Sequence, residues 1–202
     1  MKSPFIKKIF NGLIRRFLGT QIQKVHYLGT MVLPQHSDVD SLVKPLEYND
    51  FLLGDKEEFT PAKLDIISRR LEDKSYKAYG IIENDTLIYS CWISLETLGL
   101  PVLLNEPLKL GSEEGYLEDD YCAIKSRGRG IHTQMIAYRL NELYRMGRKV
   151  CITTVMDGNI AAIKANLKNG MKELGVFHCG RVFWQPFCTL TPKKKLQFDS
   201  NL

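Results

Sequence analysis

Apolar residues, many of them β-branched or aromatic, gather in several short runs bounded by polar and turn-forming residues in the first half of the chain, which is typical of strands. Such runs predict strands at residues 23–33, 76–83 and 86–94. Only Asn84-Asp85 separates the last two runs, so they predict a hairpin. Residues 35–58 are polar and irregular.

A helix is predicted from Thr60 to about Asp73, because threonine caps helix N-termini and Pro61 fits the first helical position. Residues 95–114, in contrast, contain two prolines and two glycines and show no clear period. A loop of that length in a small domain is usually functional, and we expect it to overhang a substrate site.

The second half of the chain has a regular strand, helix, strand pattern. Strands are predicted at 116–124 and 149–155, with a helix at 131–146 between them. Short links of this kind predict a right-handed crossover that joins two parallel strands. The helix carries its apolar residues on one face, at Ile131, Met135, Ile136, Leu140, Leu143 and Tyr144.

A shorter helix at about 159–169 and a strand pair at 172–187 around Gly180 follow. The whole pattern predicts an α/β fold with one mixed sheet, antiparallel in its first half, in a single domain at 21–190. A basic polar tail at 191–202 ends the chain, and no internal repeat is visible.

Residues 1–20 form a separate segment in which apolar side chains recur at helical spacing with lysines and arginines between them. The apolar runs are too broken for a transmembrane span or a signal-peptide core, so we expect a basic amphipathic helix. Such a helix is typical of a segment that packs on its own domain or forms a homodimer contact. It is also typical of one that lies on an anionic membrane surface, and of a cleaved or disordered leader such as a transit peptide.

The net charge of +5 conceals a strong asymmetry. Residues 124–172 carry ten basic and two acidic side chains, a net charge of +8, whereas residues 38–123 carry eight basic and nineteen acidic ones, a net charge of −11. This division favours a ligand with a phosphate-rich end and a cationic end. It argues against DNA or RNA, which so many carboxylates would repel.

The five cysteines include no C-x-x-C pair and mostly lie in strand-like runs. They are therefore predicted to be reduced, buried thiols in a cytoplasmic protein. No His/Cys spacing supports a metal site, so none is expected.

The turn from Arg127 to His132, with the sequence R-G-R-G-I-H, has the composition of a phosphate site. Gly128 and Gly130 allow a tight turn whose N–H groups face one way at a helix N-terminus, where the helix dipole favours negative charge. Two arginines add charged donors. Thr133 stands where a dinucleotide G-x-G-x-x-G motif needs glycine, and the chain contains no Walker A string. The predicted ligand is a polyphosphate, and a plain tight turn with exposed arginines is the alternative.

With this turn in place, residues 76–184 resemble the GNAT superfamily of acyl-CoA-dependent N-acyltransferases. The family's phosphate loop reads Q/R-x-x-G-x-G/A, and R-G-R-G-I-H fits it at all but the last position. The family's later helix often reads N-x-x-A, with an aromatic residue four positions after the alanine and then G-F. Asn159, Ala162, Asn166, Gly170 and Met171 stand at those spacings.

The resemblance implies an acetyl or other short acyl-CoA as co-substrate, held between two parallel strands that splay apart. The pantetheine arm of CoA would pair there with backbone groups that otherwise lack partners. Carried over by position, pantetheine contacts the backbone of Cys122 and Ile124, and the pyrophosphate contacts Arg127, Gly128, Arg129, Gly130, Ile131 and His132. Further CoA contacts fall at Asn159, Asn166 and Lys168.

Two residues depart from the family pattern. His132 replaces a small residue, so its side chain must point away from the phosphates or approach them as an imidazolium. Asn166 stands where many family members have the tyrosine that protonates the leaving thiolate. An amide is no general acid, but it can donate a hydrogen bond to the sulfur, which is the catalytic role expected of Asn166.

An amine must lose a proton before it attacks a thioester, and a carboxylate is the usual acceptor of that proton. Strand alternation places Glu118 and Asp120 on the same face as Cys122, while Asp119 and Tyr121 face the other side. Since buried carboxylates are costly unless used or paired, Glu118 is the first candidate for the base and Asp120 the second. Solvated acids, or acids paired with arginines, are the alternative. A backbone N–H near Cys122 is expected to stabilise the oxyanion.

Tyr89, Trp92 and Tyr116 lie beside the predicted acceptor cleft, where they either stack on a sugar or base or belong to the core. The central region resembles family members that acylate amino sugars on nucleotides, so an amino sugar on a nucleotide is the predicted small-molecule acceptor. The acidic middle of the chain favours instead a polyamine or a peptide or protein amine. The remaining alternative is a non-catalytic acyl-CoA-binding or membrane-associated module, for which Asn166 and the basic N-terminal helix argue.

Overall fold

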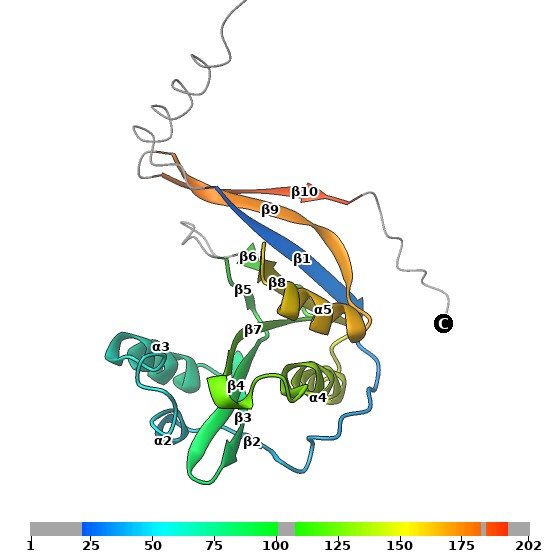
Figure 1. Ribbon diagram of the computed structural model, residues 1–202. Helices are drawn as coiled ribbons and strands as arrows, with labels where there is room; N and C mark the ends of the chain where they lie inside the picture. The colour runs from blue at the N-terminus through cyan, green and yellow to red at the C-terminus, as the bar shows by residue number, and fades with distance from the viewer. Residues whose placement is uncertain (1–21, 101–107, 183–184, 194–202) are drawn as a thin grey trace, which may run out of the picture.

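The computed structural model of the protein describes residues 22–100, 108–182 and 185–193 (Figure 1). The predicted N-terminal helix at 1–20 lies outside the described residues, as do residues 101–107 of the predicted loop. In the described part of the chain, no helix is both long and apolar enough to span a membrane.

Eight strands form one sheet in the order β10-β9-β1-β8-β7-β4-β3-β2. All neighbours in this sheet are antiparallel except β7 and β8, which are parallel. The mixed sheet with one parallel pair confirms the predicted fold class. The strands are β1 (Gln23–Met31), β2 (Val43–Pro45), β3 (Tyr76–Glu83), β4 (Thr86–Ser94), β7 (Glu114–Cys122), β8 (Val150–Met156), β9 (Lys172–Val182) and β10 (Gln185–Pro192).

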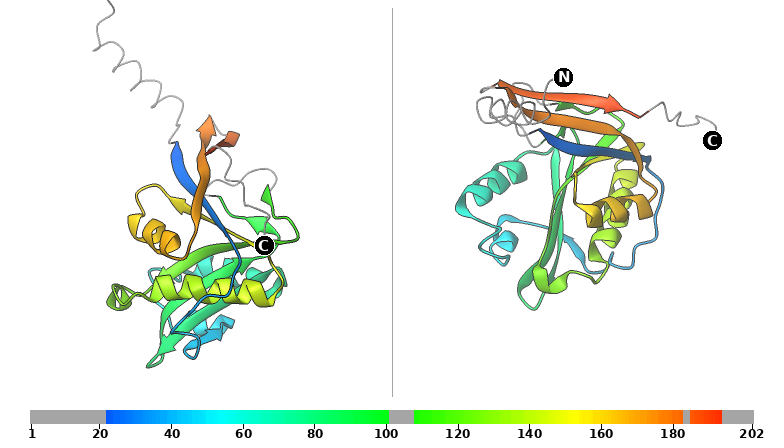
Figure 2. Two further views of the ribbon diagram at one scale, coloured as in Figure 1. Left: turned by 90° about the vertical axis from the view of Figure 1, so that its right-hand side faces the viewer. Right: turned by 45° about the horizontal axis from the view of Figure 1, so that its top comes forward.

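Helices cover both faces of this sheet (Figures 1 and 2). One face carries α2 (Tyr48–Phe51) and α3 (Pro61–Glu72), and the other carries α4 (Ile131–Arg145) and α5 (Ile160–Lys168). A short 3-10 helix, η1 (Ile124–Ser126), joins β7 to the turn before α4, and a two-stranded sheet of β5 (Thr97–Leu98) and β6 (Leu108–Lys109) lies in the predicted loop.

Local chemistry sets several of these boundaries. The Thr60 hydroxyl accepts a hydrogen bond from the Lys63 N–H at 3.4 Å, which caps α3 as predicted. Asn84 and Asp85 have φ angles of 49° and 56°. These positive values suit the two-residue turns that match the twist of a hairpin, so β3 and β4 pair as predicted.

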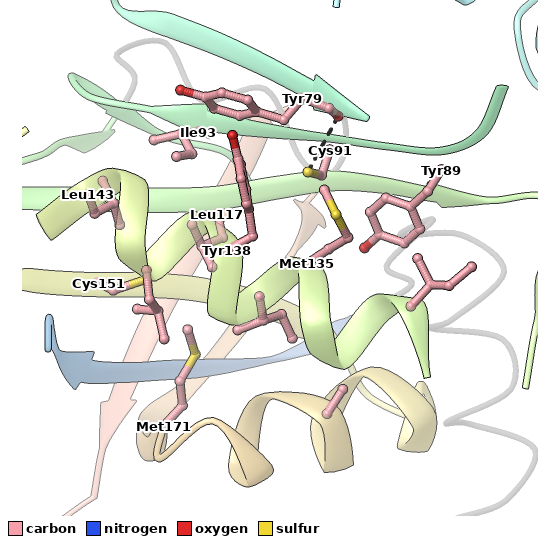
Figure 3. Close-up of a cluster of buried hydrophobic side chains, with 14 of the residues drawn as sticks. Tyr79, Tyr89, Cys91, Ile93, Leu117, Met135, Tyr138, Leu143, Cys151 and Met171 are labelled. Carbon is pink, nitrogen blue, oxygen red and sulfur yellow. Dashed lines mark hydrogen bonds between the residues drawn. The ribbon is translucent and has the colours of Figure 1, made fainter. Parts of the chain in front are cut away.

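The largest part of the core lies between the sheet and α4 (Figure 3). Met135, Leu140 and Leu143 of α4 are fully buried in it, whereas Tyr144 is exposed, contrary to its predicted place on the apolar face. A Cβ atom on Gly115 would lie 2.2 Å from Leu143, so glycine at this point of β7 lets the helix pack closely against the strand that leads to the site.

The first strand of the chain pairs with the last part of the sheet. β1 lies between β8 and β9 and is antiparallel to both, as the blue strand between its yellow and orange neighbours in Figure 1 shows. One edge of β8 is therefore occupied by β1, which leaves the other edge for β7.

The C-terminal strands correct two predictions. Gly180 lies inside β9 and pairs with Phe187, so the predicted turn at Gly180 was wrong and β10 extends to Pro192. Cys179 and Cys188 stand opposite each other in this pair, with Cα atoms 4.1 Å apart, and form a disulfide. The prediction of reduced thiols was therefore wrong for Cys179 and Cys188, whereas Cys91, Cys122 and Cys151 are free.

Candidate functional site

The two parallel strands separate part-way along their length. β7 and β8 pair from Glu114 and Val150 as far as Leu117 and Thr153, although β7 continues to Cys122 and β8 to Met156. The outer edges of the two strands remain paired with β4 and β1. Beyond Leu117, the facing backbone edges have no strand partner in the described part of the chain, and such groups need hydrogen bonds from elsewhere.

A cleft of about 810 Å³ occupies this separation, a size typical of small-molecule sites. It runs from the splayed strands to the first turns of α4 and α5, and Glu118, Asp119 and Asp120 form its acidic wall. Its other lining residues include Gly99, Tyr116, Tyr121, Cys122, Arg127, Gly128, Gly130, Ile131, His132, Thr133, Thr154, Asn159, Ala162 and Asn166.

The glycine turn opens onto this cleft at the start of α4. Gly128 and Gly130 have φ angles of 80° and 77°, and Gly130 is the N-cap residue. No atom lies within 4 Å of the point where a Cβ would stand on either glycine, so the turn needs glycine for its conformation and leaves its outer side open. The first N–H groups of α4 have no intrahelical acceptor, which makes this turn an anion-binding arrangement.

The two arginines of the turn have different surroundings. Arg127 lines the cleft, and its Nε donates to the Cys122 carbonyl oxygen at 3.2 Å. Arg129 instead forms a two-pronged ion pair with Glu83 of the β3–β4 hairpin, at 2.9 Å and 2.8 Å. Glu83 thus holds the Arg129 guanidinium, and the predicted contact of the Arg129 backbone with the pyrophosphate stays a prediction.

A β-bulge in β7 changes which acidic side chains share a face. The pairing of β7 with β4 shifts between Ser90 and Trp92, and Asp119 has a φ angle of 51°. The extra residue puts Glu118 on the α3 face with Asp119, while Asp120 lies on the α4 face. The predicted common face for Glu118 and Asp120 was wrong because alternation fails at a bulge.

Glu118 has the surroundings of a proton acceptor. Its side chain is only 10% exposed and lies 3.4 Å from Arg70. Burial raises the pKa of Glu118 to about 7, while the charge of Arg70 acts in the opposite direction. A carboxylate whose pKa lies near neutrality both holds and releases a proton readily at physiological pH.

Asp120 is the counter-ion of a buried arginine. Its carboxylate accepts hydrogen bonds from Arg139 at 2.6 Å and from the Tyr89 hydroxyl at 2.7 Å. The Arg139 side chain is 1% exposed and also donates to the Trp92 carbonyl oxygen at 3.2 Å. Protonation of Asp120 would leave this buried cation uncompensated, so the geometry fits the alternative of an acid paired with an arginine.

His132 turns its ring toward the interior, as one of its two predicted alternatives requires. Its Nδ1 lies 2.6 Å from the Tyr89 hydroxyl. Since the single proton of Tyr89 goes to Asp120, we infer that Nδ1 of His132 carries the proton shared with Tyr89. Burial lowers the pKa of His132 below its usual value of 6.5, so the imidazole is neutral at pH 7.

The remaining predicted CoA contacts divide into two groups. Asn159 and Asn166 line the cleft, but each already has an intramolecular bond. The Asn159 side chain caps α5 by accepting from the Ala162 N–H at 3.2 Å, and Asn166 donates to the Ala162 carbonyl oxygen at 2.9 Å. Lys168 and Ile124 are not among the residues that line the cleft; Ile124 is 72% exposed because η1 replaces the predicted end of the strand.

The three predicted aromatic contacts also divide. Trp92 points to the α3 face, where its ring stacks on Phe51 with the ring centroids 5.6 Å apart, so it belongs to the core, which was one of its two predicted places. Tyr89 lines the cleft, but its hydroxyl already forms hydrogen bonds with Asp120 and His132. Tyr116 lines the cleft, and its hydroxyl donates a hydrogen bond to the Gly99 carbonyl oxygen at 2.9 Å. This bond connects the segment just after β5 to β7, close to the place where β7 and β8 separate.

Sequence reasoning missed Arg139 and Arg70. Arg139 follows Ile131 and Met135 at steps of four, in line with the apolar face of α4. A charged residue in such a line signals a buried ion pair. Nothing in the sequence separates Arg70 from its neighbour Arg69, since both stand in the last turn of a polar helix.

With this geometry established, solved structures identify the architecture. A GNAT-family protein from Novosphingobium aromaticivorans matches 88% of this chain and 69% of its own, with 14% identity and a TM-score of 0.52. A GCN5-related N-acetyltransferase from Sphaerobacter thermophilus matches 89% of this chain and 57% of its own, with 12% identity and a TM-score of 0.55. The fold is that of the GNAT acetyltransferases.

An aminoglycoside antibiotic 6′-N-acetyltransferase from Acinetobacter haemolyticus shows the same fold, with 14% identity over 79% of this chain and 98% of its own and a TM-score of 0.50. No family model matches the sequence, and no curated protein matches it. At these identities the likeness extends to the GNAT fold, and the activity is argued from the cleft itself.

Proposed function

We propose that the protein is an acyl-CoA-dependent N-acyltransferase that moves an acetyl or short acyl group to a primary amine of a small molecule. One observation carries this proposal: the unpaired edges of β7 and β8 lead directly to a glycine turn at the N-terminus of α4. An extended chain with amide groups suits the first part of this path, and a pyrophosphate suits the second.

The residues of the cleft fit acyl-CoA along its length. The backbone beyond Leu117, including Cys122, offers hydrogen bonds to the pantetheine arm. Gly128, Gly130 and the first N–H groups of α4 offer donors to the pyrophosphate. This arrangement would place the thioester next to the acidic wall of the cleft.

The acidic wall supplies the chemistry that acyl transfer needs. Glu118 accepts the proton that the amine loses as its nitrogen bonds to the acyl carbon, and the carbon–sulfur bond then breaks to release the thiolate. A backbone N–H near Cys122 stabilises the negative charge that develops on the carbonyl oxygen. Asn166 retains the remaining hydrogen of its amide for the departing sulfur, since the other one is donated to Ala162.

For the acceptor, we propose an amino sugar. The aminoglycoside acetyltransferase named above has the same fold and, by its name, acylates an amine on an antibiotic built from amino sugars. The carboxylate of Glu118 at the cleft suits any cationic amine, so polyamines and lysine-containing peptides belong in the same test.

An assay of thiol release from acetyl-CoA tests the proposal. The acceptors are amino sugars, both free and nucleotide-linked, an aminoglycoside, a polyamine and a lysine peptide. Glu118→Gln is expected to lower kcat by about 10²–10⁴-fold, the usual contribution of a general base. CoA affinity, measured by calorimetry, is expected to stay unchanged because the backbone makes the cofactor contacts. Glu113→Gln, at an exposed ion pair with Lys149, is the matched control.

CoA binding without thiol release for any acceptor would instead indicate a non-catalytic acyl-CoA-binding module. Full activity of both Glu118→Gln and Asp120→Asn would show that the acceptor arrives with its amine already neutral. The protein would then act by holding the two reactants together.

A further inference from the structure

Arg70 lies in a fixed position on the α3 face of the sheet, directly beside the acidic wall of the cleft. Its guanidinium carbon is 5.3 Å from the centre of the Tyr76 ring and 5.5 Å from that of Trp92. Trp92 is itself held by stacking on Phe51. Two aromatic faces therefore hold the cation, and such contacts favour arginine because its planar group stacks well.

Arg70 contacts two consecutive carboxylates, which a regular strand would place on opposite faces. Its Nη2 is 3.4 Å from Glu118 and its Nη1 is 3.0 Å from Asp119. The bulge in β7 brings the two acids to one side. Lys63 binds the other oxygen of Asp119 at 3.1 Å, so Asp119 is anchored by two cations and in turn holds Arg70.

Gly99 limits the position of Glu118 from the opposite side. A Cβ on Gly99 would stand 2.9 Å from the carboxylate oxygen that faces Arg70, so this segment packs directly on Glu118. The carboxylate is confined between Arg70 and Gly99, at the wall of the cleft.

We propose that Arg70 is a positioning residue that orients the Glu118 carboxylate toward the cleft and stabilises its negative charge. This inference rests on the proposed function, in which Glu118 accepts the proton of the amine. Arg70 itself does not line the cleft, so it acts through Glu118.

The charges around Glu118 determine the direction of the effect. Asp119 and Asp120 on its own strand raise the pKa of Glu118, as burial does, while Arg70 from α3 and Arg139 from α4 lower it. The Tyr116 hydroxyl is neutral at these pH values because burial raises its pKa well above the usual range, and Lys63 is bound to Asp119. Arg70 comes first among the groups that oppose burial, so its removal raises the pKa of Glu118 further.

The test compares the pH dependence of kcat in the wild type with that of Arg70→Gln and Arg70→Lys. Arg69→Gln is the matched control, because Arg69 is the neighbouring residue on α3 and forms an exposed ion pair with Asp65. An opposite charge at this distance lowers a carboxyl pKa by about one unit or more, so Arg70→Gln is expected to move the acidic limb upward by about one pH unit. The resulting loss is about tenfold on the acidic side and disappears at alkaline pH.

The KM for acyl-CoA is expected to stay unchanged in both Arg70 variants. Arg70→Lys restores the charge without the two-pronged guanidinium, so its limb should lie between those of the wild type and Arg70→Gln. An equal loss at every pH, or an acidic limb that does not move, would overturn the proposal. If thermal melting shows that Arg70→Gln does not fold, the Arg70→Lys variant alone tests the proposal. An acidic limb of Arg70→Lys at the same pH as that of the wild type would then overturn the proposal.

A carbon-13 NMR titration of the Glu118 carboxyl gives a readout that does not need activity. A higher midpoint in Arg70→Gln supports the role of Arg70 even if no acceptor releases thiol, in which case only the proposed function fails. An unchanged midpoint together with normal turnover in the wild type overturns the role of Arg70 and leaves the proposed function intact.

Discussion

Replacement of Asp120 by asparagine should destabilise the protein far more than the loss of an ordinary surface carboxylate. The Arg139 side chain is 1% exposed, and Asp120, at 2.6 Å, is its only carboxylate partner among the described residues. Asparagine preserves the shape of the side chain and one acceptor oxygen, so the change removes the charge and little else. The positive charge of Arg139 would then be buried without compensation.

The expected loss follows from this burial. Removal of one member of a buried ion pair costs about 3–5 kcal/mol in the free energy of unfolding. Because the Asp120 side chain is 27% exposed and the Trp92 carbonyl oxygen still accepts from Arg139, the lower end of the range, about 3 kcal/mol, applies. With a urea dependence of about 3 kcal/mol per molar, the unfolding midpoint falls by about 1 M.

Urea unfolding followed by circular dichroism measures this shift. Asp65→Asn provides the control, because it breaks an exposed pair with Arg69 one turn apart on α3, which contributes at most about 0.5 kcal/mol. If Asp120→Asn lost no more stability than this control, the buried pair would not stabilise the fold. A folded Asp120→Asn protein that lost the acidic limb of its pH profile would show that Asp120, and not Glu118, is the base.

Three further predictions concern the cofactor turn, a charged cluster on β1 and the N-terminal segment. Gly130→Asp should weaken CoA binding about tenfold or more in calorimetry, because it puts a negative charge against the phosphates, whereas Gly147→Asp, at a similar φ angle beyond the other end of α4, should not. The hydrogen bond to Glu173 raises the pKa of His26 in the folded protein above 6.5. The free energy of unfolding should therefore fall as the pH rises from 6.5 through the raised pKa, and His26→Gln should abolish this pH dependence. Deletion of residues 1–20 should leave CoA affinity unchanged, and a truncated protein that folds but does not bind CoA would contradict the domain boundary. Sedimentation with and without anionic liposomes would show whether the segment binds membranes.

Features that depend on neighbouring residues were predictable from the sequence. The cap at Thr60 and the two-residue turn at Asn84-Asp85 follow from local hydrogen bonding and backbone preference. The parallel pair follows from short links around one helix, and the glycine turn from residues that tolerate a positive φ. These elements form the fold around the cleft and its phosphate end.

Features that depend on distant strands were not predictable. The bulge at Asp119 reverses the facing of Glu118 and Asp120, yet the three acidic residues look like any alternating run. The disulfide arises from the register of β9 on β10, which no spacing of cysteines reveals.

The position of β1 between β8 and β9 determines when the sheet can be completed. His26 of β1 bonds Asp157 and Glu173, which lie 131 and 147 residues further along the chain. During synthesis the N-terminal strand therefore leaves the ribosome long before either of its partners exists, and it remains an unpaired strand edge throughout that interval. Contacts over such separations also slow folding, because the chain entropy of the intervening loop is lost before the pairing is gained. The wall of the cleft formed by β8 is thus expected to be among the last parts of the protein to acquire native order.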